Sequence, residues 1–325
     1  MLTRRYFLQS LVTVGTVSGL GLTGVCSVWA AQNTWRQTRL FMGTMVEVTV
    51  AQVCQQQADD ALGVAFARGQ ALAKLFSRFD SSSPVTVLNT QGRLEDCPAE
   101  WQAVMEGAAA VHAQSGGAFD LTVLPLLQLM EKSHGKPRRA ELQGALRLVG
   151  QDNLVQSGTG WSFANQGMGL TLDGIAKGYI AQQMSIALTA LGCPDHMVNA
   201  GGDIVAHGSP AQDKPWRVGI ADPIHKGRHV RTLALAPQGG AVATSGFSEF
   251  RFDQAGHSNH LLLPQTGASS SWASVTVAAP TGLEADALAT ACAVMPAGAA
   301  LQLVAGMGQG YGCHVLTRDG RLLSA

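Results

Sequence analysis

The chain has 325 residues with 22 basic and 22 acidic side chains, so its formal net charge at pH 7 is zero. A protein that binds the phosphate backbone of nucleic acids needs a clustered basic surface, and this balance argues against that class of partner. The length allows one large domain or two smaller ones, and no Pro- or Ser-rich linker divides the sequence, which favours a single fused body.

The first 30 residues have the features of a twin-arginine export signal. Arg4 and Arg5 precede an uncharged stretch over 11–31, and small residues near Ala30 mark a cleavage boundary. Loss of this segment leaves 20 basic and 22 acidic residues, a net charge near −2. The alternatives are a retained membrane anchor or a lipid anchor at Cys26. The sequence predicts a signal peptide over 1–30, a mature domain over 31–325, and a periplasmic location reached by the twin-arginine route.

The first part of the mature chain predicts one strand and two helices. Residues 44–50 alternate apolar and polar side chains, which is typical of a half-buried strand. Residues 55–78 and 98–114 place apolar side chains at helical spacing, and a glycine pair stops the second helix. A polar loop is expected at 80–84.

The second part predicts a helix over 174–191, closed by Gly192, among several short strands. The strands are expected at 197–199, 216–220, 232–235, 249–253, 274–278 and 313–317. Several are spaced for hairpins rather than for helical crossovers. The predicted fold class is therefore α+β, with mainly antiparallel sheets covered by helices.

Residues 281–291 predict a helix start that carries two oxygen ligands. Thr281 and Glu284 have the spacing of a capping box, so a helix is expected to begin there. Asp286 and Thr290 are four residues apart, which puts a carboxylate and a hydroxyl on one helix face. Because Mg²⁺ prefers oxygen donors and takes only one or two protein carboxylates, the pair predicts a magnesium site. The alternative is a solvated helix face.

The helix start at Gly174 is a second candidate for ligand binding. Gly174 and Gly178 flank Lys177 at the point where the helix is expected to begin. Unpaired N–H groups and the partial positive charge of a helix N-terminus can seat a phosphate, and Lys177 adds a cation. The spacing matches neither a Walker P-loop nor a dinucleotide fingerprint. The alternative is that these glycines only allow close packing.

Turns rich in small residues supply further candidates. The turns expected at 199–203 and 243–246 allow either tight chain reversal or close approach of the backbone to a ligand. His260 precedes a Pro-Gln-Thr-Gly turn, and imidazole is a ready proton acceptor near neutral pH. The turns around Met42 and Asp120 are candidates for the wall of a cleft; the alternative is that they only reverse the chain. A lone histidine is otherwise more often structural.

Six cysteines are present, and Cys26 falls in the leader. The other five are odd in number and include no close sequence pair: Cys54, Cys97, Cys193, Cys292 and Cys313. At least one thiol is therefore expected to stay unpaired, and none is assigned to catalysis. Cys292 lies in an apolar helical segment and is expected to fill the core.

In this order, the motifs resemble the ApbE family of FAD:protein FMN transferases. The matching blocks span nearly the whole mature chain and lie at 42–44, 76–79, 88–89, 117–120, 174–178, 199–203, 244–246, 260–267 and 284–290. The resemblance implies transfer of the FMN part of FAD to a threonine or serine hydroxyl of a target protein, with AMP released and Mg²⁺ required. Pyrophosphate cleavage needs positioning, charge neutralisation and a base, and the residues above can supply each.

The resemblance also implies roles for individual residues. Contacts to FAD are implied for Met42, Phe79, Ala118, Phe119, Asp120, Thr171, Lys177 and Leu261. The Mg²⁺ site is implied at Gly174, Asp286, Ala289 and Thr290. His260 is implied as the base that takes the proton from the acceptor hydroxyl.

Two departures from the family pattern bear on the site. Family members often read Asp-Leu-Gly-Gly before Ile-Ala-Lys-Gly, whereas this chain has Thr171 and Asp173, so either Asp173 serves instead or that contact is weaker. Many members read His-Ile-Ile-Asp-Pro, whereas this chain has Leu263 before the proline. The missing carboxylate predicts a less well oriented or less basic His260, and hence reduced activity or fewer acceptors.

Two other functions remain open at this stage. One is a Mg²⁺-dependent FAD pyrophosphatase, in which water replaces the protein hydroxyl, and the other is a non-catalytic flavin-binding maturation factor. The expected partner is a flavin-acceptor protein of the cell envelope, such as a subunit of a respiratory electron-transfer complex. No stable membrane span is expected after signal removal.

Overall fold

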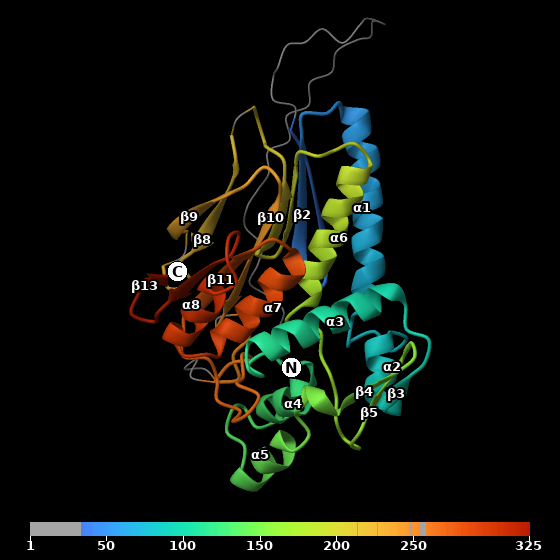
Figure 1. The fold of residues 1–325 in the computed structure, drawn as a ribbon, viewed down its shortest axis with the longest axis vertical. Helices are drawn as coiled ribbons and strands as arrows, with labels where there is room; N and C mark the ends of the chain where they lie inside the picture. The colour runs from blue at the N-terminus through green and yellow to red at the C-terminus, as the bar shows by residue number, and fades with distance from the viewer. Residues whose placement is uncertain (1–33, 213, 226, 248, 254–257) are drawn as a thin grey trace, which may run out of the picture. The chain divides into compact units, whose positions relative to one another are not determined.

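The largest element of the fold is an eight-stranded antiparallel sheet. The structure is a computed structural model that describes residues 34–212, 214–225, 227–247, 249–253 and 258–325. The strands of the large sheet are β1 (Thr34–Phe41), β2 (Thr44–Ala51), β6 (His196–Ala200), β7 (Asp203–His207), β10 (Gly240–Gly246), β11 (Ser274–Ala279), β12 (Gly312–Leu316) and β13 (Leu322–Ser324). Their order across the sheet is β1-β2-β6-β7-β10-β11-β12-β13 (Figure 1).

Alternating side chains direct the two faces of this sheet to different layers. In β2, Val46, Val48 and Val50 join the main hydrophobic core, whereas Ala51 joins a smaller cluster. In β10, Val242 faces the smaller cluster and its neighbours join the main core. Because successive residues of a strand point to opposite faces, the two cores lie on opposite sides of the sheet.

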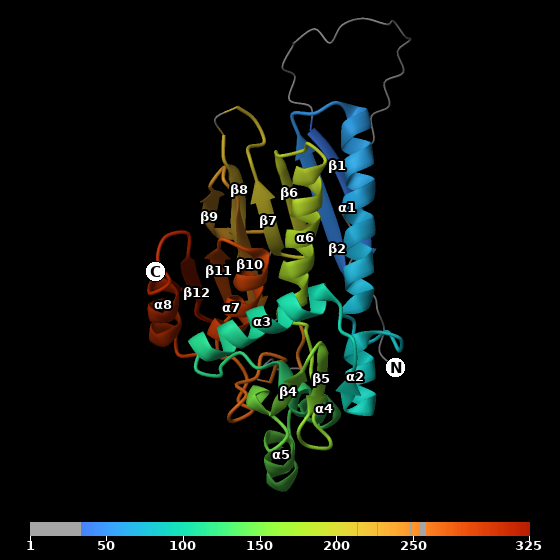
Figure 2. The ribbon, with the colours of Figure 1, turned by 45° about the vertical axis from the view of Figure 1, so that its right-hand side comes forward.

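Helices cover the face that carries the main core. These are α1 (Gln55–Leu75), α6 (Ala176–Ala190), α7 (Gly282–Ala293) and α8 (Ala297–Ala305), and both ribbon views show them in front of the strands (Figures 1 and 2). The long helix α3 (Ala99–Gln114) crosses near the end of α7 in the same two views (Figures 1 and 2). The hairpin β8 (Trp216–Ala221) and β9 (His229–Leu235) covers the other face through Trp216, Val218 and Leu235.

The remaining elements gather on the far side of α3 from the large sheet (Figures 1 and 2). They are α2 (Pro84–Gln91), α4 (Leu124–Lys132), α5 (Arg139–Leu146) and a small sheet of β3 (Arg93–Leu94), β4 (Leu154–Ser157) and β5 (Gly160–Phe163). A third cluster packs Leu126 and Met130 of α4 against Phe252 and Leu262. The segment that carries His260 is therefore anchored to α4.

The predicted fold class is confirmed, and most predicted elements are present with shifted ends. Helix α1 ends at Leu75, and α6 begins at Ala176. The strands predicted at 197–199, 216–220, 232–235 and 274–278 fall within observed strands, and the one predicted at 313–317 extends one residue past the end of β12. All five described cysteines are free, and Cys292 is fully buried in the core as expected. The predicted signal peptide lies outside the described residues.

Three local predictions were wrong. Residues 249–253 form no strand, because Arg251 makes only an isolated bridge to Asn259. Residues 243–246 are not a turn but the end of β10. The expected loop ends at Ser83, whose hydroxyl accepts a hydrogen bond from Thr86 N (3.1 Å) and caps helix α2, which was not predicted.

Helices α6 and α7 touch through their backbones at a pair of glycines. A Cβ atom at Gly178 would lie 2.0 Å from the carbonyl oxygen of Gly282, and one at Gly282 would lie 2.3 Å from that of Gly178. Gly178 therefore allows close packing of the two helices, which was one of the two interpretations of its motif. The contact brings the start of α6 against the first turn of α7.

We expect Gly178→Ala to destabilise the protein by about 3 kcal/mol or more, because the added methyl group must push α7 away. Urea unfolding measures this change. The matched control is Gly63→Ala, in the middle of α1, where an added Cβ meets no atom within 4 Å. The control should be neutral or stabilising by about 0.5–1 kcal/mol. Equal effects of the two substitutions would contradict the close contact.

His196 is buried in the core as a neutral imidazole. Its Nε2 accepts a hydrogen bond from Ser185 Oγ (2.6 Å), and its Nδ1 donates to the carbonyl oxygen of Cys193 (2.7 Å). Burial lowers the pKa of His196 to about 4. An unfolded histidine titrates near 6.5, so the unfolded chain binds the extra proton between these values and the folded protein does not.

His196 should therefore make stability depend on pH. Its contribution to the free energy of unfolding, about 3 kcal/mol, is present above pH 6.5 and is lost as pH falls towards 4. Urea unfolding at pH 7.5 and pH 4.5 measures this loss, and His196→Gln should lose less stability over the same interval. Parallel pH dependences for the two proteins would show that His196 does not titrate in this way.

Candidate functional site

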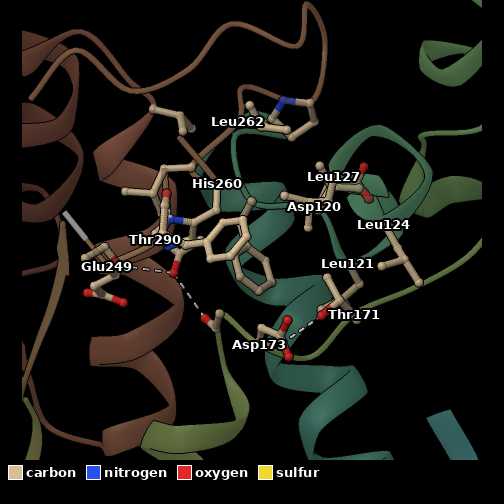
Figure 3. A pocket seen from close by; sticks show the side chains of 18 of the residues that line it. Asp120, Leu121, Leu124, Leu127, Thr171, Asp173, Glu249, His260, Leu262 and Thr290 are labelled. Carbon is tan, nitrogen blue, oxygen red and sulfur yellow. Dashed lines mark hydrogen bonds between the residues drawn. The ribbon is translucent and has the colours of Figure 1, made fainter. Parts of the chain in front are cut away.

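A cavity of about 510 Å³ opens where the helical layer meets the group of elements beyond α3. Its wall combines the segment after α1, residues between 118 and 131, the loop before α6, the end of β10, residues of 249–252 and of 260–264, and helix α7. Figure 3 shows these side chains around one hollow. Most of the predicted site residues line it, namely Phe79, Ala118, Phe119, Asp120, Thr171, Gly174, Lys177, His260, Leu261, Asp286 and Thr290.

Two predicted residues do not line this cavity. Met42 lies in the β1–β2 turn and packs against the main core. Ala289 is fully buried in the core, because neighbouring residues of a helix point about 100° apart and Thr290 takes the cavity side. For these two residues, the roles implied by the resemblance stay predictions.

Asp286 and Thr290 face the cavity from one side of α7. Asp286 is only 3% exposed, so the alternative of a solvated helix face is wrong. Its Oδ2 accepts a hydrogen bond from Gly178 N (2.9 Å). Thr290 Oγ1 lies 3.4 Å from the carbonyl oxygen of Gly174 and 3.4 Å from Ser245 Oγ (Figure 3). Two hydroxyls and one carbonyl thus lie together, and the Asp286 carboxylate lines the same cavity.

The cap of α7 follows the prediction only in part. Thr281 Oγ1 accepts the backbone N–H of Glu284 (3.2 Å), so Thr281 is the N-cap as expected. The Glu284 carboxylate does not complete a capping box, and instead accepts from the hydroxyls of Thr281 (2.7 Å) and Tyr311 (2.8 Å). The helix start is therefore tied to the segment before β12.

Lys177 lies among three carboxylates. It forms an ion pair with Asp203, which follows the paired glycines of the β6–β7 turn. Burial lowers the pKa of Lys177, but Asp203, Asp286 and Glu249 outweigh this effect and the pKa is raised overall. Burial also raises the pKa of Asp286, and Asp203 raises it further against the opposing effect of Lys177.

The charges and oxygen atoms of this wall fit a divalent cation. With every group ionised, three carboxylates and one ammonium leave two uncompensated negative charges, which a single Mg²⁺ would balance. The described residues contain no group of three His, Cys, Asp or Glu side chains arranged as metal ligands. Mg²⁺ needs no such group, because one or two carboxylates, other oxygen atoms and water suffice.

His260 approaches the cavity from the segment after residue 258 (Figure 3). Its Nδ1 lies 3.1 Å from the carbonyl oxygen of Phe250. A carbonyl only accepts hydrogen bonds, so Nδ1 carries the proton in the neutral ring and Nε2 is left as the proton acceptor. The backbone thus orients the imidazole. Leu263 does not line the cavity, and the effect of this leucine on His260 stays a prediction.

Asp120 and Thr171 hold loops at the cavity wall. The Asp120 carboxylate accepts hydrogen bonds from Thr122 N (2.7 Å) and Gln151 N (3.0 Å). Thr171 Oγ1 accepts from Asp173 N (3.2 Å), and its backbone N–H donates to Leu121 O (2.8 Å). Both side chains therefore fix the shape of the wall.

Sequence reasoning missed several residues of the site. Arg78, Ser245 and Glu249 line the cavity, and Asp203 pairs with Lys177. Asp173, named from sequence as a possible replacement for an aspartate at position 171, also lines the cavity. Asp203 had a usable signal, since it follows two glycines at a strand end. Glu249 had none, because it lies in a segment predicted as a strand.

An α+β fold that brings a carboxylate, a lysine and an imidazole around one cavity has the side chains of an enzyme's active site. The family model of the ApbE family matches residues 42–314, so the chain belongs to the ApbE family.

Individual relatives agree with this assignment. The FAD:protein FMN transferase of Klebsiella pneumoniae (strain 342) is 27% identical over 293 residues, which cover 86% of this chain and 83% of the relative. That of Salmonella typhimurium (strain LT2) is 28% identical over 268 residues, which cover 78% and 76%. The crystal structure of the ApbE protein from Thermotoga maritima superimposes with a TM-score of 0.81 at 25% identity, covering 90% of this chain and 97% of that one. The flavin transferase ApbE from Vibrio cholerae gives 0.77 at 22% identity with the same coverage, which supports the fold.

Proposed function

We propose that the protein transfers the FMN moiety of FAD to a threonine or serine hydroxyl of another protein, with release of AMP. The observation that carries this proposal is the cavity itself, which places His260 in one wall and the oxygen cluster of Asp286 and Thr290 in the same enclosure. We infer the substrate FAD from the relatives, which are named FAD:protein FMN transferases.

The residues divide the work of phosphoryl transfer. Lys177 offers a positive charge to the phosphate oxygens. Asp286, Thr290 Oγ1 and Gly174 O would hold Mg²⁺, which when bound neutralises charge on the pyrophosphate. The enclosing apolar residues, among them Leu121, Leu124 and Leu262, limit access of water to the reacting phosphate.

The transfer step needs one base. His260 Nε2 takes the proton of the acceptor hydroxyl, whose oxygen then bonds to the phosphorus of the FMN half. The bond from that phosphorus to the bridging oxygen breaks, and AMP leaves with the oxygen. Nδ1 stays bound to Phe250 O throughout and keeps the ring in place.

One assay tests the proposal. The mature protein is mixed with FAD, Mg²⁺ and a cell-envelope protein that carries a flavin-acceptor threonine, and both AMP release and flavin fluorescence on the denatured acceptor are followed. We expect labelled acceptor and an equal amount of AMP. AMP with free FMN and no labelled acceptor would identify a pyrophosphatase, and no product at all would identify a flavin-binding maturation factor.

We further propose that the protein acts in the periplasm on an envelope redox protein, since Arg4 and Arg5 and the apolar stretch after them have the pattern of a twin-arginine leader. Among the described residues, no helix is long and apolar enough to cross a membrane. Cell fractionation tests this location. The Arg4→Lys, Arg5→Lys double variant should remain in the cytoplasm, and its export at the normal level would refute the route.

A further inference from the structure

Arg78 and Asp173 form an ion pair at the wall of the cavity. The bond from Arg78 Nε to Asp173 Oδ2 (2.7 Å) joins the segment after α1 to the loop before α6, 95 residues away in sequence. The Arg78 side chain is 26% exposed and that of Asp173 is 51% exposed. Ion pairs with this exposure contribute little to stability. The main effect of this pair is therefore to fix the position of the guanidinium group.

The guanidinium group of Arg78 covers one face of the Phe79 ring. Arg78 Cζ lies 4.2 Å from the ring centroid, which is the geometry of a cation–π contact. Phe79 lines the cavity and yet is 79% exposed, and no other aromatic ring among the described residues packs on it. The ring therefore has one supported face and open surface beside the cavity.

The local backbone around Phe79 is also fixed. Phe79 N donates a hydrogen bond to Ser77 Oγ (3.1 Å), and Ser83 Oγ donates to the carbonyl oxygen of Ser77. On the other side of the ion pair, Thr171 Oγ1 holds the backbone N–H of Asp173 (3.2 Å). Both partners of the pair thus start from ordered backbone.

We propose that Asp173 and Arg78 hold the Phe79 ring as a platform on which a planar ring of FAD stacks. This inference rests on the proposed function. Asp173 restrains the guanidinium group, the guanidinium supports one face of Phe79, and the free face takes the flavin or adenine ring. Phe79 is the binding residue, and Arg78 and Asp173 are positioning residues. Asp173 therefore acts on the ligand through Arg78, and does not serve as a direct ligand in place of an aspartate at position 171.

Ligand binding without turnover tests the platform. Dissociation constants for FAD and FMN are measured from the quenching of flavin fluorescence, and that for AMP by calorimetry, with no acceptor protein present. Phe79→Ala should weaken FAD binding by about tenfold, and Phe79→Tyr should restore it. Asp173→Asn and Arg78→Met should weaken it by about three- to tenfold. If these variants also weaken FMN binding, the flavin ring stacks on Phe79. If they weaken AMP binding instead, the adenine ring does.

A double-mutant cycle separates positioning from simple structural damage. If Asp173 acts through Phe79, Asp173→Asn should have almost no further effect on FAD affinity in the Phe79→Ala background. The matched control is Glu95→Gln, which breaks an exposed Arg–Glu pair that does not line the cavity and should leave affinity unchanged. Circular dichroism and the melting temperature verify folding of every variant.

Additive effects in the cycle, or unchanged FAD affinity in Asp173→Asn, would overturn the platform. Because binding is measured without acceptor, the two proposals fail separately. A protein that binds FAD through Phe79 but labels no acceptor refutes only the transferase function. A protein that labels the acceptor but gives additive effects refutes only the platform. Failure of the unmodified protein to bind FAD would refute both.

Discussion

Asp286→Asn is expected to lose about a hundredfold or more of the FMN transfer rate, because the variant lacks the only charged group among the proposed Mg²⁺ ligands. Asparagine has nearly the same shape, and its side-chain oxygen can still accept the hydrogen bond from Gly178 N. Transfer is followed by flavin fluorescence on the acceptor. Added FAD should not restore the rate, whereas a large excess of Mg²⁺ should restore it in part.

Stability distinguishes loss of the metal site from loss of the fold. Burial raises the pKa of Asp286, so the folded protein disfavours the charged form, and the neutral asparagine should not lower stability without metal. Mg²⁺ should raise the melting temperature of the unmodified protein but not that of Asp286→Asn. The control Glu106→Gln removes one negative charge outside the cavity and should change neither property. A normal melting response to Mg²⁺ in Asp286→Asn would place the metal elsewhere.

The part of the site that could be predicted from sequence is the part encoded locally. Thr281 caps α7 within four residues, and helical spacing alone puts Asp286 and Thr290 on one face. Lys177 and Gly178 sit at a helix start for the same local reason. The pattern cannot say that this face is buried, however, since burial depends on α6 and β10, which lie far away in sequence.

The rest of the site depends on contacts between distant segments. The Arg78–Asp173 pair spans 95 residues, and each member looks like an ordinary surface charge in its own segment. The pair of Lys177 with Asp203 depends likewise on how the β6–β7 turn meets α6. Helices α4 and α5 were not predicted, although α4 supports the His260 segment through Met130 and Leu126. Such arrangements follow from the tertiary fold and leave no periodic signal.

The Leu263 departure predicted a missing orienting group, and the structure offers a different one in the backbone. A carboxylate three residues after His260 suggested an orienting partner for the imidazole. In the structure, the carbonyl of Phe250 orients His260, and Leu263 lies in a turn where its carbonyl accepts from Gly267 N (2.8 Å). We therefore expect Leu263→Asp to leave the transfer rate within about twofold, the result expected for a position that does not touch the reacting groups.

His260→Asn is the second substitution with a large expected effect. Asparagine can reproduce the donor at Nδ1 and keep the hydrogen bond to Phe250 O, but it has no group in place of Nε2. Removal of a general base typically slows a reaction by about 10²- to 10⁴-fold, and we expect a loss in this range for transfer to the acceptor. The dissociation constant for FAD should change by less than about threefold, because the base acts on the acceptor hydroxyl.

A matched histidine separates base catalysis from general effects of the substitution. His134 adopts a left-handed backbone conformation (φ 51°) that asparagine also tolerates, and it does not line the cavity. His134→Asn should therefore transfer FMN at the normal rate. If His260→Asn kept more than a third of the normal rate, the proton would have to go to another group of the same cavity. Glu249 would then be the first to test, because it lines the cavity, does not pair with Lys177 and is not among the proposed metal ligands.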